Sequence, residues 1–102
     1  MLTRSLDGNR VELLTVSSST DKLNKKVVVL MARAHPGESC SSWVLKGFLD
    51  YILSNNDDAC DLRERFIFKI IPLLNPDGVI HGNFRCSLSG RDLNRVWNKP
   101  SK

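Results

Sequence analysis

The sequence predicts an α/β fold, because two strand-like runs are separated by a helical segment. The runs Lys26–Ala32 and Phe66–Ile71 are largely apolar and rich in β-branched residues. Continuous apolarity over that length is typical of strands buried on both faces of a sheet. Strands that alternate with helices are the pattern of α/β proteins. We expect one domain at most, because the chain has 102 residues, which is near the lower end for a well-buried core.

The first part of the chain is expected to hold two strands and two loops. The stretch Val11–Val16 is β-rich, although its alternation is imperfect, and a loop of Ser, Thr and Asp follows at Ser17–Asp21. The strand Lys26–Ala32 comes next. After it, His35–Ser42 is predicted to be a loop, because Pro and Gly interrupt it and its serines can cap a helix.

Two helices are expected before the last strand. The segment Trp43–Ser54 has apolar side chains at helical spacing, and Asn55 and Asn56 end it. These apolar residues are Val44, Phe48, Tyr51 and Ile52. A shorter helix is expected at Asp57–Arg65, because its first two residues are acidic and favour the positive N-terminal end of a helix.

The last strand is followed by a turn and a long polar segment. Pro72 ends the strand, and Asn75–Gly78 is a strong turn signal, since Pro presets φ and Gly tolerates positive φ. After Gly82 the chain is polar and without periodicity as far as Lys102.

For the assembled sheet, we expect Val27–Ala32 and Phe66–Ile71 to be the central strands. The helix at Trp43–Ser54 should cover one face of that sheet.

Composition excludes several classes of protein. The 15 Lys and Arg exceed the 11 Asp and Glu by four, but they do not cluster, so we expect no nucleic-acid binding. No apolar run approaches the roughly 20 residues that span a bilayer, so we expect no membrane association. Three cysteines without C-x-x-C spacing, and an N-terminus unlike a secretory signal, indicate a reducing, cytoplasmic location.

His35 and Glu38 form an H-x-x-E pattern at the end of a predicted buried strand. Sites in α/β proteins gather outside the carboxyl ends of strands. An imidazole nitrogen and a carboxylate oxygen at this spacing can share one Zn²⁺ if a third ligand comes from elsewhere. The alternative is that His35 is a polar loop residue and Glu38 a helix-start charge.

The segment 83–95 combines three arginines, two asparagines and one aspartate without secondary-structure periodicity. A guanidinium is the preferred partner for a carboxylate, and an Asn amide can donate a further hydrogen bond. The segment is therefore either an anion-binding loop or an ordinary solvated one.

Three motifs in this order resemble the zinc carboxypeptidases, specifically the cytosolic carboxypeptidase subfamily. They are His35-Pro36-Gly37-Glu38, Asn75-Pro76-Asp77-Gly78-Val79-Ile80 and the run Arg85–Arg95, and Ser41–Asp50 also resembles a helix of that subfamily. The resemblance runs from about Leu6 to Trp97 and covers only the first part of the family's catalytic domain. It implies a truncated α/β/α sandwich with a mixed sheet flanked by helices. Residues 1–102 are then the N-terminal portion of a metallocarboxypeptidase catalytic domain, with no second domain.

The resemblance also implies roles for single residues. His35 and Glu38 match the first two ligands of one zinc ion, and Arg85 matches the residue that polarises the scissile carbonyl and steadies the oxyanion. Asn94 and Arg95 match the pair that holds the substrate's C-terminal carboxylate. Asp92 matches the carboxylate that orients the histidine ligand, as metal sites require.

The implied activity is removal of C-terminal residues, typically glutamates from polyglutamylated tails such as those of tubulin. The implied partners are thus acidic C-terminal peptide tails. The family's third zinc ligand, a histidine, and its general-base glutamate lie downstream of these motifs and are absent from this chain. An alternative is therefore an inactive remnant that binds acidic tails or has no independent function.

Two further features are open to interpretation. His81 is the other histidine, and the pairs His35/Cys40 and His81/Cys86 share H-x₄-C spacing. A structural Cys₂His₂ zinc is conceivable, although the spacing is not the usual one. The two tryptophans, Trp43 and Trp97, are predicted to be packing residues.

Overall fold

The computed structural model describes residues 1–18 and 24–100. Its elements follow the order β1 (Thr3–Arg4), β2 (Arg10–Val11), β3 (Leu14–Val16), β4 (Lys26–Met31), α1 (Cys40–Ile52), α2 (Asp57–Arg65), β5 (Phe66–Ile71), α3 (Pro76–Ile80) and the 3₁₀ helix η1 (Leu93–Arg95). Most of the loop predicted at Ser17–Asp21, and the last two residues of the polar segment that runs to Lys102, lie outside the described residues.

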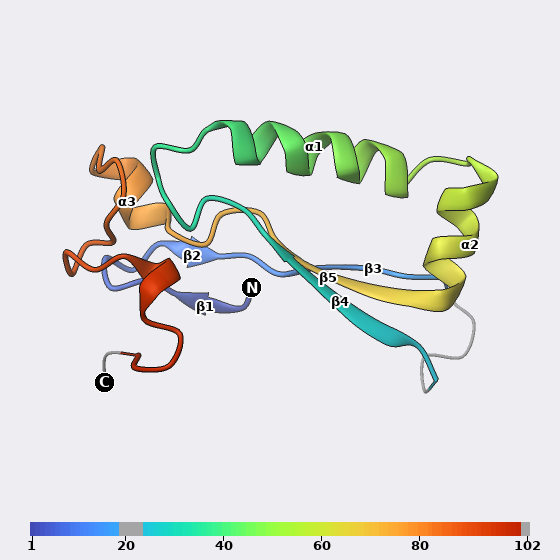
Figure 1. Cartoon of the computed structure of the whole chain (residues 1–102), viewed down its shortest axis with the longest axis horizontal. Coiled ribbons are helices and arrows are strands. Elements are labelled where there is room, and N and C mark those ends of the chain that lie inside the picture. Colours follow the sequence, from blue (N-terminus) through green and yellow to red (C-terminus); the bar gives the residue numbers. More distant parts are fainter. Residues whose placement is uncertain (19–23, 101–102) are drawn as a thin grey trace.

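The main sheet is mixed, with the strand order β3-β5-β4. β4 runs parallel to β5, so that Val28 is paired with Phe68 and Leu30 with Ile70. β3 runs antiparallel to β5. The connection from β4 to β5 passes through α1 and α2, as parallel neighbours require, and α1 lies along one face of the sheet (Figure 1). The predicted α/β class with a mixed sheet and flanking helices is confirmed.

One prediction about the sheet is half right. β5 is the central strand, but β4 lies at the edge of the sheet that the described residues form. Its side chains also alternate in exposure, with Val27 and Val29 more than half exposed, so β4 is not buried on both faces. The physical reason is that α1 covers only one face of the sheet, and no described element covers the other.

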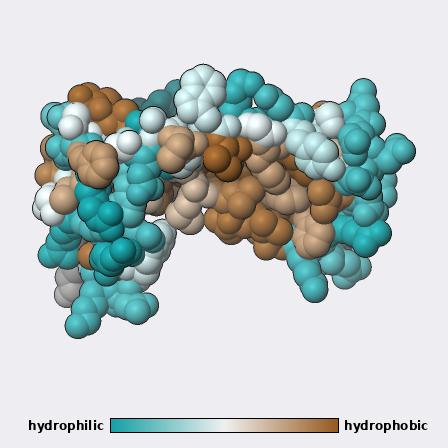
Figure 2. Space-filling view, turned by 45° about the horizontal axis from the view of Figure 1, so that its top comes forward, coloured by the Kyte–Doolittle hydropathy of each residue, from teal (hydrophilic) through white to brown (hydrophobic). Residues whose placement is uncertain are grey.

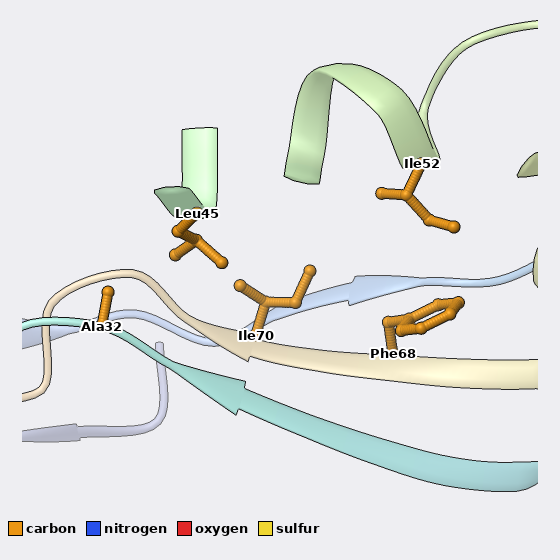
Figure 3. Close-up of a cluster of buried hydrophobic side chains, with 5 residues drawn as sticks. All are labelled: Ala32, Leu45, Ile52, Phe68 and Ile70. Carbon is orange, nitrogen blue, oxygen red and sulfur yellow. The ribbon is translucent and has the colours of Figure 1, made fainter. Parts of the chain in front are cut away.

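The core lies between α1 and the covered face of the sheet. Figure 3 shows its buried side chains pointing toward one another from the helix and the strands. They are Ala32, Leu45, Ile52, Phe68 and Ile70. Phe48 packs edge-on against Phe68, with ring centroids 5.5 Å apart, a favourable aromatic geometry.

The helix α1 begins at Cys40, earlier than predicted. Of the four apolar residues noted at helical spacing, Ile52 is buried and Phe48 is partly buried against the core, whereas Val44 and Tyr51 are exposed. α2 has the predicted bounds, and the side chain of its N-cap Asn56 accepts a hydrogen bond from the backbone N–H of Asp58.

Two predicted elements, the strand Val11–Val16 and the turn Asn75–Gly78, differ in the structure. Val11–Val16 is not one strand, because residues 12 and 13 have no regular secondary structure and separate β2 from β3. β2 instead pairs with β1 in a separate two-stranded hairpin. Asn75–Gly78 is the start of helix α3, where Asn75 accepts from the N–H of Gly78 and Pro76 occupies the first turn.

A broad apolar area lies on the surface of the molecule. Figure 2 shows hydrophobic surface in the middle of one face, with a hydrophilic end on the right and a mixed end on the left. A groove between β4 and α1 is lined by the side chains of Leu30, Met31, Val44, Leu45 and Phe48. Within the described residues, no helix is long and apolar enough to cross a membrane.

Candidate functional site

The candidate site forms where the loop after β4, the helix α3 and the C-terminal segment meet at one end of the molecule (Figure 1). The loop leaves β4 through Arg33, which has a φ of 56°, a conformation that non-glycine residues rarely adopt. The Arg33 side chain donates to the carbonyl of Pro36 at 3.0 Å and to the hydroxyl of Ser42. These contacts hold the loop that carries His35 in one shape.

Asn75 and Gly78, at the start of α3, contact the same loop. Asn75 is buried, and its amide nitrogen donates to the carbonyl of Ala34. Gly78 approaches the loop so closely that a Cβ there would overlap the Pro36 ring and lie 2.8 Å from the carbonyl oxygen of Cys86. The backbone N–H of Gly37 donates to the carbonyl of Phe84 at 2.7 Å. Loop, helix and C-terminal segment are therefore tied together.

The imidazole of His35 is buried and lies between two carboxylates. Its Nδ1 is 3.2 Å from Oε1 of Glu38, and its Nε2 is 2.8 Å from Oδ1 of Asp92. The Asp92 carboxylate can only accept when ionised, so Nε2 carries a proton and donates it. In the neutral imidazole this leaves Nδ1 with the lone pair, on the side of Glu38.

Asp92 connects several parts of the site. Besides His35, its carboxylate accepts from Nε of Arg85 at 2.6 Å and from the backbone N–H of Asn94 at 2.9 Å. Burial alone would raise the pKa of Asp92, but the hydrogen bonds from His35, Asn94 and Arg85 outweigh it and lower this pKa to about 2. Asp92 is therefore ionised at neutral pH.

The sequence-predicted residues are placed as follows. His35, Glu38, Asp92 and Arg85 form one connected cluster. Asn94 joins it through its backbone N–H and lies with Arg95 in the short helix η1. Arg95 is exposed, and its Nη1 donates to the carbonyl of Asn94.

The donor set partly fits a zinc ion. Two ligands of one tetrahedral zinc lie about 3.4 Å apart, which is close to the distance between Nδ1 of His35 and Oε1 of Glu38. Asp92 supplies the hydrogen-bonded partner that a histidine ligand requires. Within residues 1–18 and 24–100, however, no three His, Cys, Asp or Glu side chains gather in a group that could hold a metal.

The other metal interpretation, a Cys₂His₂ site, is wrong. All four of its residues are described, and they do not form a metal-binding group. His81 instead pairs with the carboxylate of Asp7 at 3.0 Å on the surface.

Sequence reasoning missed one buried carboxylate. Asp77 accepts hydrogen bonds from the hydroxyl of Ser5, the amide of Asn9 and the backbone N–H of Asp7. Although burial opposes ionisation, these bonds lower its pKa. Asp77 thereby anchors the N-terminal hairpin to α3, and the only signal in the sequence was an aspartate inside a predicted turn.

The prediction that both tryptophans are packing residues is wrong. Trp43 is 72% exposed on α1, and Trp97 is 57% exposed after η1. Trp97 donates a hydrogen bond from its indole nitrogen to the side chain of Asn94.

In the comparison with protein families, residues 1–101 match the family described as zinc carboxypeptidase. Among similar sequences, the human "Cytosolic carboxypeptidase 2" is 62% identical over 94% of this chain. The human "Cytosolic carboxypeptidase 1" is 51% identical over 99% of it. The chain spans only 11% and 9% of the lengths of these two relatives.

Solved structures with the same fold are also found. A metallo-carboxypeptidase from Burkholderia cenocepacia superposes with a TM-score of 0.89 and 36% identity, over 98% of this chain and 28% of that one. A metallo-carboxypeptidase from Pseudomonas aeruginosa, solved with (2-guanidinoethylmercapto)succinic acid, gives a TM-score of 0.86 and 33% identity. That match covers 96% of this chain and 26% of the other.

Proposed function

The chain belongs to the zinc carboxypeptidase family, and from this premise we propose that it is the N-terminal portion of the catalytic domain of an enzyme that removes C-terminal residues from peptides. The single observation that carries the proposal is the position of the His35 ring between Glu38 and Asp92. One carboxylate lies at the nitrogen that can bind a metal, and the other fixes the tautomer that leaves this nitrogen free.

In this proposal, His35 and Glu38 are two ligands of one zinc ion, and the third comes from chain beyond these residues. The chemistry that zinc supplies in such sites is polarisation of a carbonyl and acidification of a water molecule. Asp92 holds the His35 ring in place and keeps its Nε2 proton. None of these three residues needs to move during the reaction, which is how preorganised sites lower a barrier.

Arg85 is proposed to stabilise the developing oxyanion of the scissile carbonyl. Its Nε is bound to Asp92, and the two terminal nitrogens of the guanidinium carry further N–H groups that can donate to substrate. Asn94 and Arg95 are exposed next to this cluster, and we propose that they bind the terminal carboxylate of the peptide. A guanidinium and an amide together recognise such a group well.

For the substrate, we propose a peptide with a glutamate-rich C-terminal tail, such as a polyglutamylated tail of tubulin, in the cytoplasm. The support is the similarity to proteins named cytosolic carboxypeptidases and a net charge of +4, which suits an acidic partner.

A second function is favoured by the incomplete ligand set. A catalytic zinc site has three protein ligands, and the described residues hold no third one beside His35 and Glu38. If the protein does not complete this set, its carboxylate-binding residues remain, and it would bind acidic C-termini without cleaving them.

The test uses the protein at the full length that its gene encodes. Release of glutamate from a peptide that ends in several glutamates is measured together with zinc content, for the wild type and Arg85→Ala. The enzyme proposal expects release that Arg85→Ala reduces by about two to three orders of magnitude, as for other oxyanion donors. Binding without release supports the second function, and neither binding nor release refutes both. The matched control is Arg65→Ala on the exposed face of α2.

A further inference from the structure

Trp97 and Asn94 form a hydrogen bond that determines how the Asn94 amide is turned. The indole Nε1 of Trp97 lies 2.9 Å from Oδ1 of Asn94. An indole N–H can donate but not accept, so the amide atom that faces it has to be the carbonyl oxygen. The amide nitrogen of Asn94 is therefore directed away from Trp97.

The backbone of Asn94 also forms hydrogen bonds, whereas its side-chain amide nitrogen forms none that the structure describes. Its backbone N–H donates to Asp92, and its backbone carbonyl accepts from Nη1 of Arg95 at 3.0 Å. In the part of the chain that the structure describes, the Asn94 amide nitrogen has no hydrogen-bond partner. Two donor hydrogens beside an arginine are thus available to an acceptor ligand.

Trp97 lies beside apolar residues. It lines an apolar depression together with Leu74, Leu93, Val96 and Pro100, and it is 57% exposed. The hydrogen bond to Asn94 is therefore what gives its indole N–H one direction.

The direction of the amide matters for binding an anion. The last torsion of an Asn side chain has a broad, roughly two-fold profile, so an amide without a partner populates both orientations. In the flipped orientation, the carbonyl oxygen of Asn94 would face a bound carboxylate and repel it. A fixed donor removes the flipped orientation before the ligand arrives.

We propose that Trp97 is a positioning residue for carboxylate recognition, because it holds the Asn94 amide with its NH₂ group toward the ligand. This inference rests on the proposed role of Asn94 and Arg95 as the residues that bind the substrate's terminal carboxylate. It assigns to Trp97 no contact with the substrate itself.

The test compares two peptides that differ only at their C-terminus, one ending in a glutamate with a free α-carboxylate and the other in the corresponding α-amide. Their dissociation constants are measured for the full-length protein, for Trp97→Phe, for Asn94→Ala and for the double variant. A second replacement of Trp97 by benzothienylalanine, which has sulfur in place of the indole N–H, keeps the ring size in case Trp97→Phe disturbs the packing. Trp43→Phe on α1 is the matched control.

The expected result is that both replacements of Trp97 reduce the preference for carboxylate over amide by about three- to tenfold, the range of one neutral hydrogen bond. In the Asn94→Ala background, replacing Trp97 should cause no further reduction, because the group that it positions is gone.

Other outcomes overturn the inference in distinguishable ways. If Asn94→Ala lowers the preference and Trp97→Phe does not, Trp97 has no positioning role and the proposed function stands. If replacing Trp97 weakens binding of both peptides equally, its role is packing or direct contact. The same holds if the replacement lowers the carboxylate preference as much in the Asn94→Ala background as in the wild type. If the wild type binds both peptides equally, the carboxylate-binding role of Asn94 and Arg95 fails, and this inference fails with it.

Discussion

Nε2 of His35 lies 2.8 Å from Oδ1 of Asp92, although the two residues are 57 positions apart in the chain. One residue follows an edge strand, and the other precedes a short helix in a segment without regular structure. Their contact joins the proposed metal-binding residues to the proposed anion-binding residues, because Asp92 also binds Arg85 and the backbone of Asn94. Five predictions follow from this site and from the elements that support it.

Replacing Asp92 by Asn should alter how stability depends on pH. The pKa of Asp92 is about 2 in the folded protein, below its ordinary value of 3.8. A carboxyl with a lowered pKa stabilises the folded state fully above its ordinary pKa, and this contribution is lost as the pH falls through the folded value. The difference in unfolding free energy between the wild type and Asp92→Asn should therefore be constant above about pH 5 and shrink toward about pH 2.

The measurement is urea unfolding of both proteins at several pH values. Asp50→Asn, at an exposed position of α1, is the control and should change stability at neutral pH by less than about 0.5 kcal/mol. A difference for Asp92→Asn that stays constant down to pH 2 would contradict the prediction.

Replacing Asp77 by Ala should detach the N-terminal hairpin from α3. Three donors in residues 5–9 would lose their acceptor, and hydrogen bonds to a charged group are among the stronger ones. We expect a loss of about 2–3 kcal/mol in unfolding free energy, with faster hydrogen exchange in residues 1–11. Asp61→Ala, which removes an exposed helix pair with Arg65, should cost about 0.5 kcal/mol or less. An equal effect of the two variants would show that Asp77 is not an anchor.

Replacing Gly78 by Ala should push α3 away from the loop that carries His35. A methyl group there would meet the Pro36 ring and lie 2.9 Å from the amide nitrogen of Asn75. Overlap of this kind costs about 1–3 kcal/mol. Gly47→Ala is the matched control, because nothing lies within 4 Å of its added methyl and a helix interior gains up to about 1 kcal/mol from this change. The midpoint of thermal unfolding should thus fall for Gly78→Ala and rise for Gly47→Ala. A rise for Gly78→Ala would refute the close approach of Gly78 to the loop.

Zinc affinity of the full-length protein should depend on the residues around His35. His35→Ala and Glu38→Ala each remove a proposed ligand and should abolish stoichiometric zinc binding. Asp92→Asn should weaken it by about 10- to 100-fold, as other residues behind metal ligands do. His81→Ala is the control, because this histidine pairs with Asp7 on the surface. The measurement is zinc content after dialysis against a weak chelator. Undiminished zinc content in His35→Ala would refute the proposed ligand role of His35.

The 102-residue chain in isolation should be marginally stable or should self-associate. Val27 and Val29 are exposed on an edge strand, and uncovered apolar edges promote association. Val29→Glu places a carboxylate beside Lys69, its partner in the sheet, and should shift the chain toward monomer. Leu53→Glu makes the same change of charge at an exposed position after α1, and it should leave the association unchanged. Sedimentation in metal-free buffer provides the measurement, and a cooperative melt of a monomeric wild type would contradict the prediction.

The sequence predicted best those elements whose signals are local. Asp57–Arg65 and Phe66–Ile71 have the predicted bounds, because an N-cap and a change from polar to apolar residues mark their ends. The break in Val11–Val16 was missed, since strand pairing depends on partners far away in the chain. The apolar spacing of α1 was right for Phe48 and Ile52 but not for Val44 and Tyr51, because apolar residues occur on several sides of this helix and the position of the sheet selects which of them is buried.

By itself, the sequence determined the proximity of His35 and Glu38 and the cap that Asp92 provides for Asn94, because residues two or three positions apart meet through local geometry. Only the tertiary structure decided that Asp92 meets His35 and that Asp77 binds the hairpin at residues 5–9. Those contacts depend on the parallel pairing of β4 with β5 and on the packing of α3 against the loop after β4. Such long-range geometry results from burying a shared core, and no short stretch of sequence contains it.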